Sequence, residues 1–180
     1  MSNLAIFLET KRLILSPIEI DNLDEYHLFL NNEKNDIYTE HAEFPHSMDD
    51  IKNYIISKSK SKSSIFLGIY IKENKSHIGN IELCNINFIH GTAEYKILID
   101  SNYHKKGYAF EASKKLLEHA FQKLNLYKVN LGVSELNKSA LSLYNYLGFK
   151  KEGVLVGQIL KDNKRINIIN MSIFFNQFNL

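Results

Sequence analysis

The feature that most limits the possible folds is a strand that enters a long amphipathic helix through a glycine loop, between residues 94 and 124. Residues 94–100 alternate between two faces, which predicts a strand. Beyond Gly107, apolar side chains recur at helical spacing as far as Leu124. The chain must therefore place a long helix directly after a strand and pack its apolar stripe against a sheet.

The remaining pattern surrounds this unit with short elements. The predicted order is strand, two helices, three strands, helix, strand, helix and two strands, which indicates an α+β or mixed α/β fold. A change in the phase of alternation near Cys84 predicts a β-bulge. The expected strands are 12–17, 65–71, 78–89, 94–100, 127–133, 154–160 and 165–175, and the expected helices run over 21–30, from Ser47 through Ile55, from Gly107 and from Asn137 to Gly148.

Composition narrows the functional class. The chain has 180 residues, 44% of them apolar, and a net charge of +2, which is typical of one globular domain over 1–180 and argues against nucleic-acid binding. No long apolar run or signal peptide is apparent, so we expect no membrane partner. The lone Cys84 favours a reducing, cytoplasmic location. We interpret the basic stretch Lys58–Lys62 as a solvated loop.

The loop before the long helix has the character of an anion site. The first amides of a helix lack internal partners, and the helix dipole adds partial positive charge there. Gly107 allows close backbone approach to a pyrophosphate, and Lys105 and Lys106 add charge at the rim. On these residues alone, an ordinary strand-to-helix turn with a glycine is the favoured interpretation.

A second segment decides between these interpretations. The pattern Asn-x-x-Ala-x-x-x-Tyr-x-x-x-Gly-Phe follows one strand later, and together the two segments resemble the GNAT superfamily of N-acetyltransferases. The first segment matches that family's cofactor loop at Gly107 and Ala109, whereas His104 stands where the family has Gln or Arg. The second segment matches the family pattern in full at Asn137, Ala140, Tyr144, Gly148 and Phe149.

The resemblance extends to one branch of the superfamily and implies a fold. Residues 79–90, 93–95 and 124–128 are similar to the branch that holds spermidine acetyltransferases and ribosomal-protein N-terminal acetyltransferases. The GNAT fold implies a twisted, mostly antiparallel sheet of about seven strands with four helices. Two of its strands splay apart to hold acetyl-CoA.

The resemblance also implies an acyltransferase reaction in which an amine attacks the thioester of acetyl-CoA directly. We expect Glu94 to act as the base, with Glu82 as the alternative, and Tyr144 as the general acid. A backbone amide near Leu98 is the expected oxyanion donor. The expected cofactor contacts are Ile97, Leu98, Ile99, His104, Lys105, Lys106, Gly107, Tyr108, Ala109, Asn137, Ser139 and Tyr144, and no metal is expected.

The acceptor amine is less constrained. Glu33, Glu40 and Glu43 form an acidic region that suits a polyamine or another cationic small amine. A peptide N-terminus, an amino-sugar nucleotide and an antibiotic amine remain alternatives. A non-catalytic acyl-CoA-binding module is the alternative of another class. A homo-oligomer is also left open, because the final β-hairpin and residues 173–175 would provide an edge for a second copy.

Overall fold

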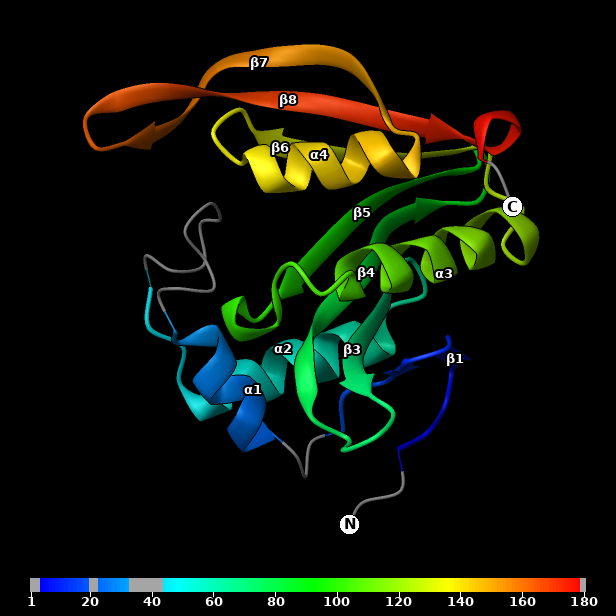
Figure 1. The fold of residues 1–180 in the computed structure, drawn as a ribbon, viewed down its shortest axis with the longest axis vertical. Coiled ribbons are helices and arrows are strands. Elements are labelled where there is room, and N and C mark those ends of the chain that lie inside the picture. Colours follow the sequence, from blue (N-terminus) through cyan, green and yellow to red (C-terminus); the bar gives the residue numbers. More distant parts are fainter. Residues whose placement is uncertain (1–3, 20–22, 33–43, 179–180) are drawn as a thin grey trace.

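The computed structural model describes residues 4–19, 23–32 and 44–178. Its centre is one sheet of eight strands in the order β1-β2-β3-β4-β5-β6-β8-β7 (Figure 1). Neighbouring strands run antiparallel except β5 and β6, which are parallel. The strands are β1 (Leu8–Glu9), β2 (Leu13–Ser16), β3 (Ile65–Ile71), β4 (His77–Asn87), β5 (Thr92–Ile99), β6 (Lys128–Ser134), β7 (Lys150–Lys161) and β8 (Lys164–Phe174).

Helices α2 and α4 begin where their capping residues predict, and α4 also ends where predicted. In the capping box of α2, the Ser47 hydroxyl accepts from the Asp50 amide at 3.1 Å, and the Asp50 carboxylate accepts from the Ser47 amide at 3.3 Å. Helix α4 has Asn137 as its N-cap and ends at Gly148, whose φ of 100° is left-handed. The described helices are α1 (Leu23–Leu30), α2 (Met48–Lys60), α3 (Tyr108–Gln122) and α4 (Lys138–Leu147).

Two apolar clusters lie on opposite faces of the sheet. The larger contains the inner faces of α3 and α4, together with side chains such as Leu116 and Phe149 that are fully buried. The smaller joins α1 and α2 to Phe66 and Leu98. Because side chains alternate along a strand, β5 contributes to both clusters, with Tyr95 in the larger and Leu98 in the smaller.

The predicted bulge is present in β4. The register between β4 and β5 shifts between Cys84 and Asn87, and Asn85 has a φ of 51°. An inserted residue turns the following side chains to the other face, which is the phase change seen in the sequence.

The parallel pair β5 and β6 separates soon after it begins. Their pairing covers only Thr92 to Glu94 on β5, opposite 128–130 on β6. Beyond that point β6 stays paired with β8 as far as Ser134, whereas β5 continues to Ile99 beside β4. The splay expected from the family resemblance is therefore present, and it opens the sheet at its centre.

The last hairpin differs from expectation in two ways. Its first strand begins at Lys150 rather than near residue 154, and β8 lies between β6 and β7. Ile173 is consequently fully buried, so it is not part of an exposed edge. The edge strand is β7, on which Val156 is 85% exposed. Pairing partners far apart in the sequence decide which strand is outermost. The short β1 strand was also not predicted.

The interpretation of Lys58–Lys62 as a solvated loop was wrong in its first half. Helix α2 continues through Lys60, and the Lys58 ammonium pairs with the buried Glu82 carboxylate. The alternation of Lys and Ser gives no sign of this last helical turn, in which only one side chain faces the sheet.

The predicted start of α1 at Asp21 lies outside the described residues. Within the described part of the chain, no helix is long and apolar enough to cross a membrane.

Candidate active site

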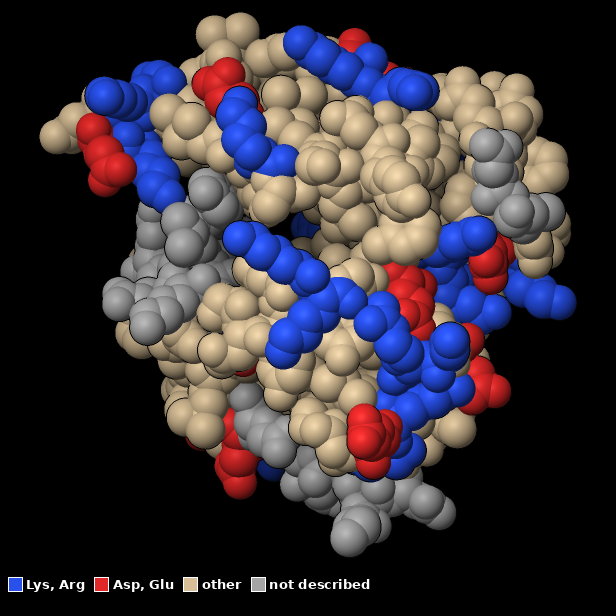
Figure 2. Space-filling view, viewed as in Figure 1, with Lys and Arg blue, Asp and Glu red and all other residues tan. Residues whose placement is uncertain are grey.

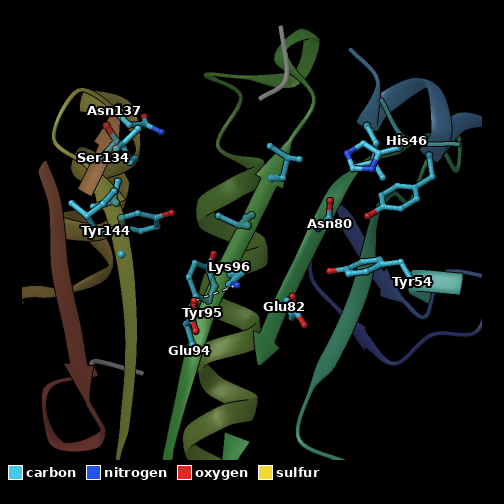
Figure 3. A pocket seen from close by; sticks show the side chains of 18 of the residues that line it. His46, Tyr54, Asn80, Glu82, Glu94, Tyr95, Lys96, Ser134, Asn137 and Tyr144 are labelled. Carbon is cyan, nitrogen blue, oxygen red and sulfur yellow. Dashed lines mark ion pairs between the residues drawn. The ribbon is translucent and has the colours of Figure 1, made fainter. Parts of the chain in front are cut away.

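A cavity of about 610 Å³ lies where β5 and β6 separate. One side is lined by the end of β6 and the start of α4, and the other by β4, α1 and α2 (Figure 3). The strand β5 crosses between them. Figure 2 shows that the molecule is hollowed between the part that carries α4 and the part that carries α3, with Lys and Arg side chains beside the hollow. The cavity therefore connects the two faces of the sheet.

Tyr144 reaches the cavity from α4. Its ring packs edge-on against Tyr95 at 6.1 Å between centroids and lies 5.8 Å from Phe149. The side chain is buried, and this burial raises the pKa of Tyr144 to about 12. The hydroxyl points into the cavity toward β5 (Figure 3). Tyr144 is therefore a protonated donor at neutral pH, held in place by aromatic packing.

Glu94 lies on β5 at the point of splay and lines the same cavity. Its carboxylate accepts from the Asn85 side-chain amide at 2.9 Å and pairs with the Lys96 ammonium at 3.3 Å. Asn85 is the bulged residue of β4, so the bulge supplies a partner that holds the carboxylate. A third of the Glu94 side chain remains exposed, which keeps it open to a proton donor in the cavity.

Glu82 lies on β4, directly opposite Lys96 on β5, and also lines the cavity. Its side chain is 4% exposed, and it accepts a hydrogen bond from the Lys58 ammonium. Burial lowers the pKa of Lys58, but the hydrogen bond and charge of Glu82 outweigh this effect and leave that pKa above its ordinary value. Both candidate bases are thus paired with lysines, and of these two lysines Lys96 lines the cavity.

The segment Ile97–Ile99 of β5 borders the splay. Ile97 and Leu98 line the cavity, and β6 pairs with none of these three residues. The Ile99 carbonyl accepts from Nε2 of His104 at 2.9 Å. His104, which differs from the family residue, therefore holds the loop against the end of β5.

The loop that follows brings Gly107 to the N-terminus of α3. Gly107 is the N-cap, with a left-handed φ of 80°. A Cβ atom there would lie 3.3 Å from Nη2 of Arg12. Lys105 and Lys106 are exposed, and none of residues 104–109 lines the cavity. The loop therefore lies outside the cavity, next to the end of β5.

Arg12 supports this loop and was not predicted. Its Nη1 donates to the Lys106 carbonyl at 2.9 Å, its Nε bonds the Glu111 carboxylate at 2.7 Å, and its guanidinium stacks over Tyr108 at 4.6 Å. Thr10 donates to the same carboxylate at 2.5 Å. No local pattern could reveal this network, because Arg12 and Glu111 are 99 residues apart in the sequence.

Asn137 and Ser139 have capping roles. The side-chain oxygen Oδ1 of Asn137 accepts from the Ala140 backbone amide at 3.0 Å and from the Ser139 hydroxyl at 3.1 Å. Asn137 lines the cavity, whereas Ser139 is not among the lining residues. The start of α4 therefore faces the splay through Asn137.

The predicted acids cannot be compared with the end of the cavity that α1 and α2 line. Glu33, Glu40 and Glu43 lie outside the described residues. Tyr26 from α1, with Asp50 and Tyr54 from α2, face the floor formed by β4 and β5. The sequence signal for these residues was their helical spacing, which also fits simple core packing.

Cys84 is buried, and burial followed by the nearby Glu82 charge raises its pKa to about 11, which leaves it a poor nucleophile. Among residues 4–19, 23–32 and 44–178, no group of three or more His, Cys, Asp and Glu side chains is arranged to hold a metal ion.

Comparison with known proteins shows the family. The family model described as Acetyltransferase (GNAT) domain matches residues 12–150. The chain belongs to the GNAT acetyltransferase family. That range includes the splayed strands, the loop and Tyr144.

Several GNAT relatives are spermidine acetyltransferases. The spermidine N(1)-acetyltransferase of Vibrio cholerae is 30% identical over 149 residues, which cover 83% of this chain and 86% of that protein. The enzyme of the same name from Escherichia coli K12 is 39% identical over 100 residues, or 56% of this chain. The matched part spans about half of that relative's length, 54%.

A solved structure agrees with these relatives. The spermidine N-acetyltransferase from Vibrio cholerae, crystallised with CoA and spermine, superposes with a TM-score of 0.84 at 28% identity and covers 93% of this chain and 98% of that one. The predicted family, its spermidine-acetyltransferase-like branch and the fold class are confirmed.

The residues of this GNAT chain fit an acyl-CoA. The β5 edge beside the splay can offer backbone groups to an extended pantetheine arm, as an added strand would. The Gly107 cradle offers helix amides to a pyrophosphate. The Arg12 side chain lies close to the position that a Cβ atom at residue 107 would take. Glycine therefore fits at this position better than a residue with a side chain.

Proposed function

We propose that this chain is an acetyl-CoA-dependent N-acetyltransferase that acetylates a polyamine or another small cationic amine. The observation that carries the proposal is the single cavity at the splay. Tyr144 reaches it from α4, and Glu82 and Glu94 reach it from β4 and β5. A donor for a leaving group and acceptors for an amine therefore meet at one gap in the sheet. The names of the relatives support the cationic acceptor.

In this proposal Glu94 receives the proton of the attacking amine. An alkyl ammonium has a pKa of about 10, so it must lose a proton before it can attack. The Glu94 carboxylate is partly open to the cavity and oriented by Asn85 at 2.9 Å. Glu82 is the alternative base, but its pairing with Lys58 and its burial give it a second role in binding a cation.

Tyr144 assists the leaving group in the same proposal. Acetyl-CoA supplies the thioester whose acetyl group the amine takes. The departing thiolate is stabilised by a hydrogen bond from the Tyr144 hydroxyl, which burial keeps protonated. The amide of Leu98, beside the splay, is the proposed donor to the developing oxyanion.

We further propose that the protein works in the cytoplasm on a small molecule. The buried lone thiol supports a reducing compartment. The confined cavity and its aromatic walls support a small acceptor better than a folded one.

The test is thiol release from acetyl-CoA with four acceptors: spermidine, spermine, a peptide with a free N-terminus and an amino-sugar nucleotide. Turnover on the polyamines, with at least a tenfold loss (~1.4 kcal/mol) in Tyr144→Phe, supports the proposal. Tyr146→Phe is the matched control, because Tyr146 lies on the same helix and is 77% exposed. Acetyl-CoA binding without turnover on any acceptor would point to a non-catalytic acyl-CoA module. Failure to bind acetyl-CoA would contradict the proposal altogether.

A further inference from the structure

Lys58 is not itself among the lining residues, but it places a primary ammonium against two residues that line the cavity, Glu82 and Tyr54. It extends from the last turn of α2, and its Nζ donates to a carboxylate oxygen of Glu82. The same Nζ lies 5.2 Å from the centroid of the Tyr54 ring. A carboxylate and an aromatic face around one ammonium form a cation subsite, and here a side chain of the protein occupies it.

The chemistry of this subsite is that of an alkylammonium substrate. The end of a lysine side chain is a primary ammonium on a methylene chain, and so is the end of a polyamine. Glu82 and Tyr54 both line the cavity, so a ligand in the cavity can reach the groups that Lys58 contacts. Two ammonium groups cannot share this position, because like charges at contact distance repel.

The charges on the cavity floor point the same way. Glu82 and Glu94 are opposed by Lys58 and Lys96, each within 3.3 Å or less of its partner. With both lysines in place, the four charges sum to zero. Asp50 adds a further carboxylate to the lining, and the departure of Lys58 makes the cavity more negative and more attractive to a polycation.

Lys58 is able to leave. Its side chain is 21% exposed, and it stands at the end of the helix rather than in its middle. A long lysine stem can turn its ammonium to water without moving the backbone. Glu82, at 4% exposed, cannot follow it, so the departure leaves a buried carboxylate that needs a new cation.

We propose that Lys58 is a specificity-determining residue that occupies the acceptor's cation subsite, and that a substrate ammonium binds by displacing it from Glu82. The proposal rests on the proposed function for the choice of a cationic amine. The displacement lowers the affinity for such amines, because each one must compete with Lys58. Lys58 thereby limits Glu82 to acceptors whose ammonium binds this carboxylate tightly enough to displace it.

The experiment compares spermidine binding by titration calorimetry in wild type and Lys58→Met, with CoA present. Removal of the competitor is expected to lower the Kd for spermidine about fivefold, the effect of about 1 kcal/mol from one ion pair. The Kd for CoA should not change. Lys60→Met is the matched control, because Lys60 is exposed on the same helical turn and should leave the spermidine Kd unaltered.

A double-mutant cycle assigns the effect to the subsite. In a Glu82→Gln background, Lys58→Met should no longer tighten spermidine binding, because the carboxylate for which the two ammoniums compete is gone. Lys58→Met should also unfold at a lower temperature, and spermidine should raise its Tm more than that of wild type. If that variant does not fold, Lys58→Gln, which keeps an N–H donor for Glu82, takes its place.

The outcomes separate this inference from the proposed function. If wild type acetylates spermidine but Lys58→Met binds it no more tightly, the displacement is wrong and the function stands. If neither protein turns over spermidine but the variant binds it more tightly, the displacement is supported and the function is wrong. Absence of spermidine binding by both proteins would overturn the displacement.

Discussion

At the scale of single residues, the site depends on polar groups whose partners are remote in the sequence. Tyr144 is set by aromatic rings from β5 and from the end of α4, Glu94 by the bulged Asn85, and the Gly107 loop by Arg12. Each partner either orients a side chain or keeps a group in one protonation state. Burial keeps Tyr144 protonated, and a hydrogen bond orients Glu94.

The raised pKa of Tyr144 predicts a contribution to stability at alkaline pH. The folded-state pKa of about 12 lies above the ordinary value of 10.0, so the folded state binds this proton more tightly. The contribution is fully present below pH 10 and is lost as the pH rises toward 12. Urea unfolding at pH 8 and pH 11 should show a loss for wild type that is smaller in Tyr144→Phe, by on the order of 1 kcal/mol. Equal losses would contradict the burial of this hydroxyl.

At the scale of elements, two short irregularities turn a regular sheet into a site. The bulge in β4 brings Asn85 to Glu94, and the left-handed Gly107 turns the chain from the β5 side into α3. The long helix then directs its first amides toward the loop. Both irregularities shape the site, and the bulge also places the buried Ile86 in the larger core.

Substitution of the loop glycine tests this view. Gly107→Ala should raise the KM for acetyl-CoA about tenfold, because a left-handed alanine costs about 1–2 kcal/mol and its Cβ would lie 3.3 Å from Arg12. The loop would then relax away from its cradle shape. Gly153→Ala in β7 is the control, since its added Cβ meets nothing within 4 Å. Steady-state kinetics with varied acetyl-CoA would measure both, and an unchanged KM in Gly107→Ala would remove this loop from the cofactor site.

At the scale of the whole molecule, the sheet is a continuous support that is open only at its centre. Antiparallel pairing holds β1 to β5 on one side of the gap and β6 to β8 on the other. The helices α1 and α2 cover the acceptor face, whereas α3 and α4 cover the face with the larger core. One cavity is therefore lined both by the β5 edge beside the splay and by the side chains of β4, α1 and α2.

The position of β8 inside the sheet leads to a stability prediction. Ile173→Ala should lower the free energy of unfolding by about 2–5 kcal/mol, because the side chain is fully buried. Val156→Lys on the neighbouring edge strand should change it by less than about 0.5 kcal/mol, because Val156 is 85% exposed. Urea denaturation measures both changes. A small effect at Ile173 would mean that β8, not β7, forms the edge.

The sequence by itself determined the kinds of elements, their order and the family. Periodicity, caps and turn residues are local, so α2 to α4, the bulge and the two motifs were all legible, as was Tyr144 as a candidate. Only the tertiary structure decided which partners meet. The Arg12–Glu111 network and the Lys58–Glu82 pair join residues 99 and 24 positions apart. No local pattern encodes such contacts, because strand pairing and helix packing bring them together only when the whole sheet has formed.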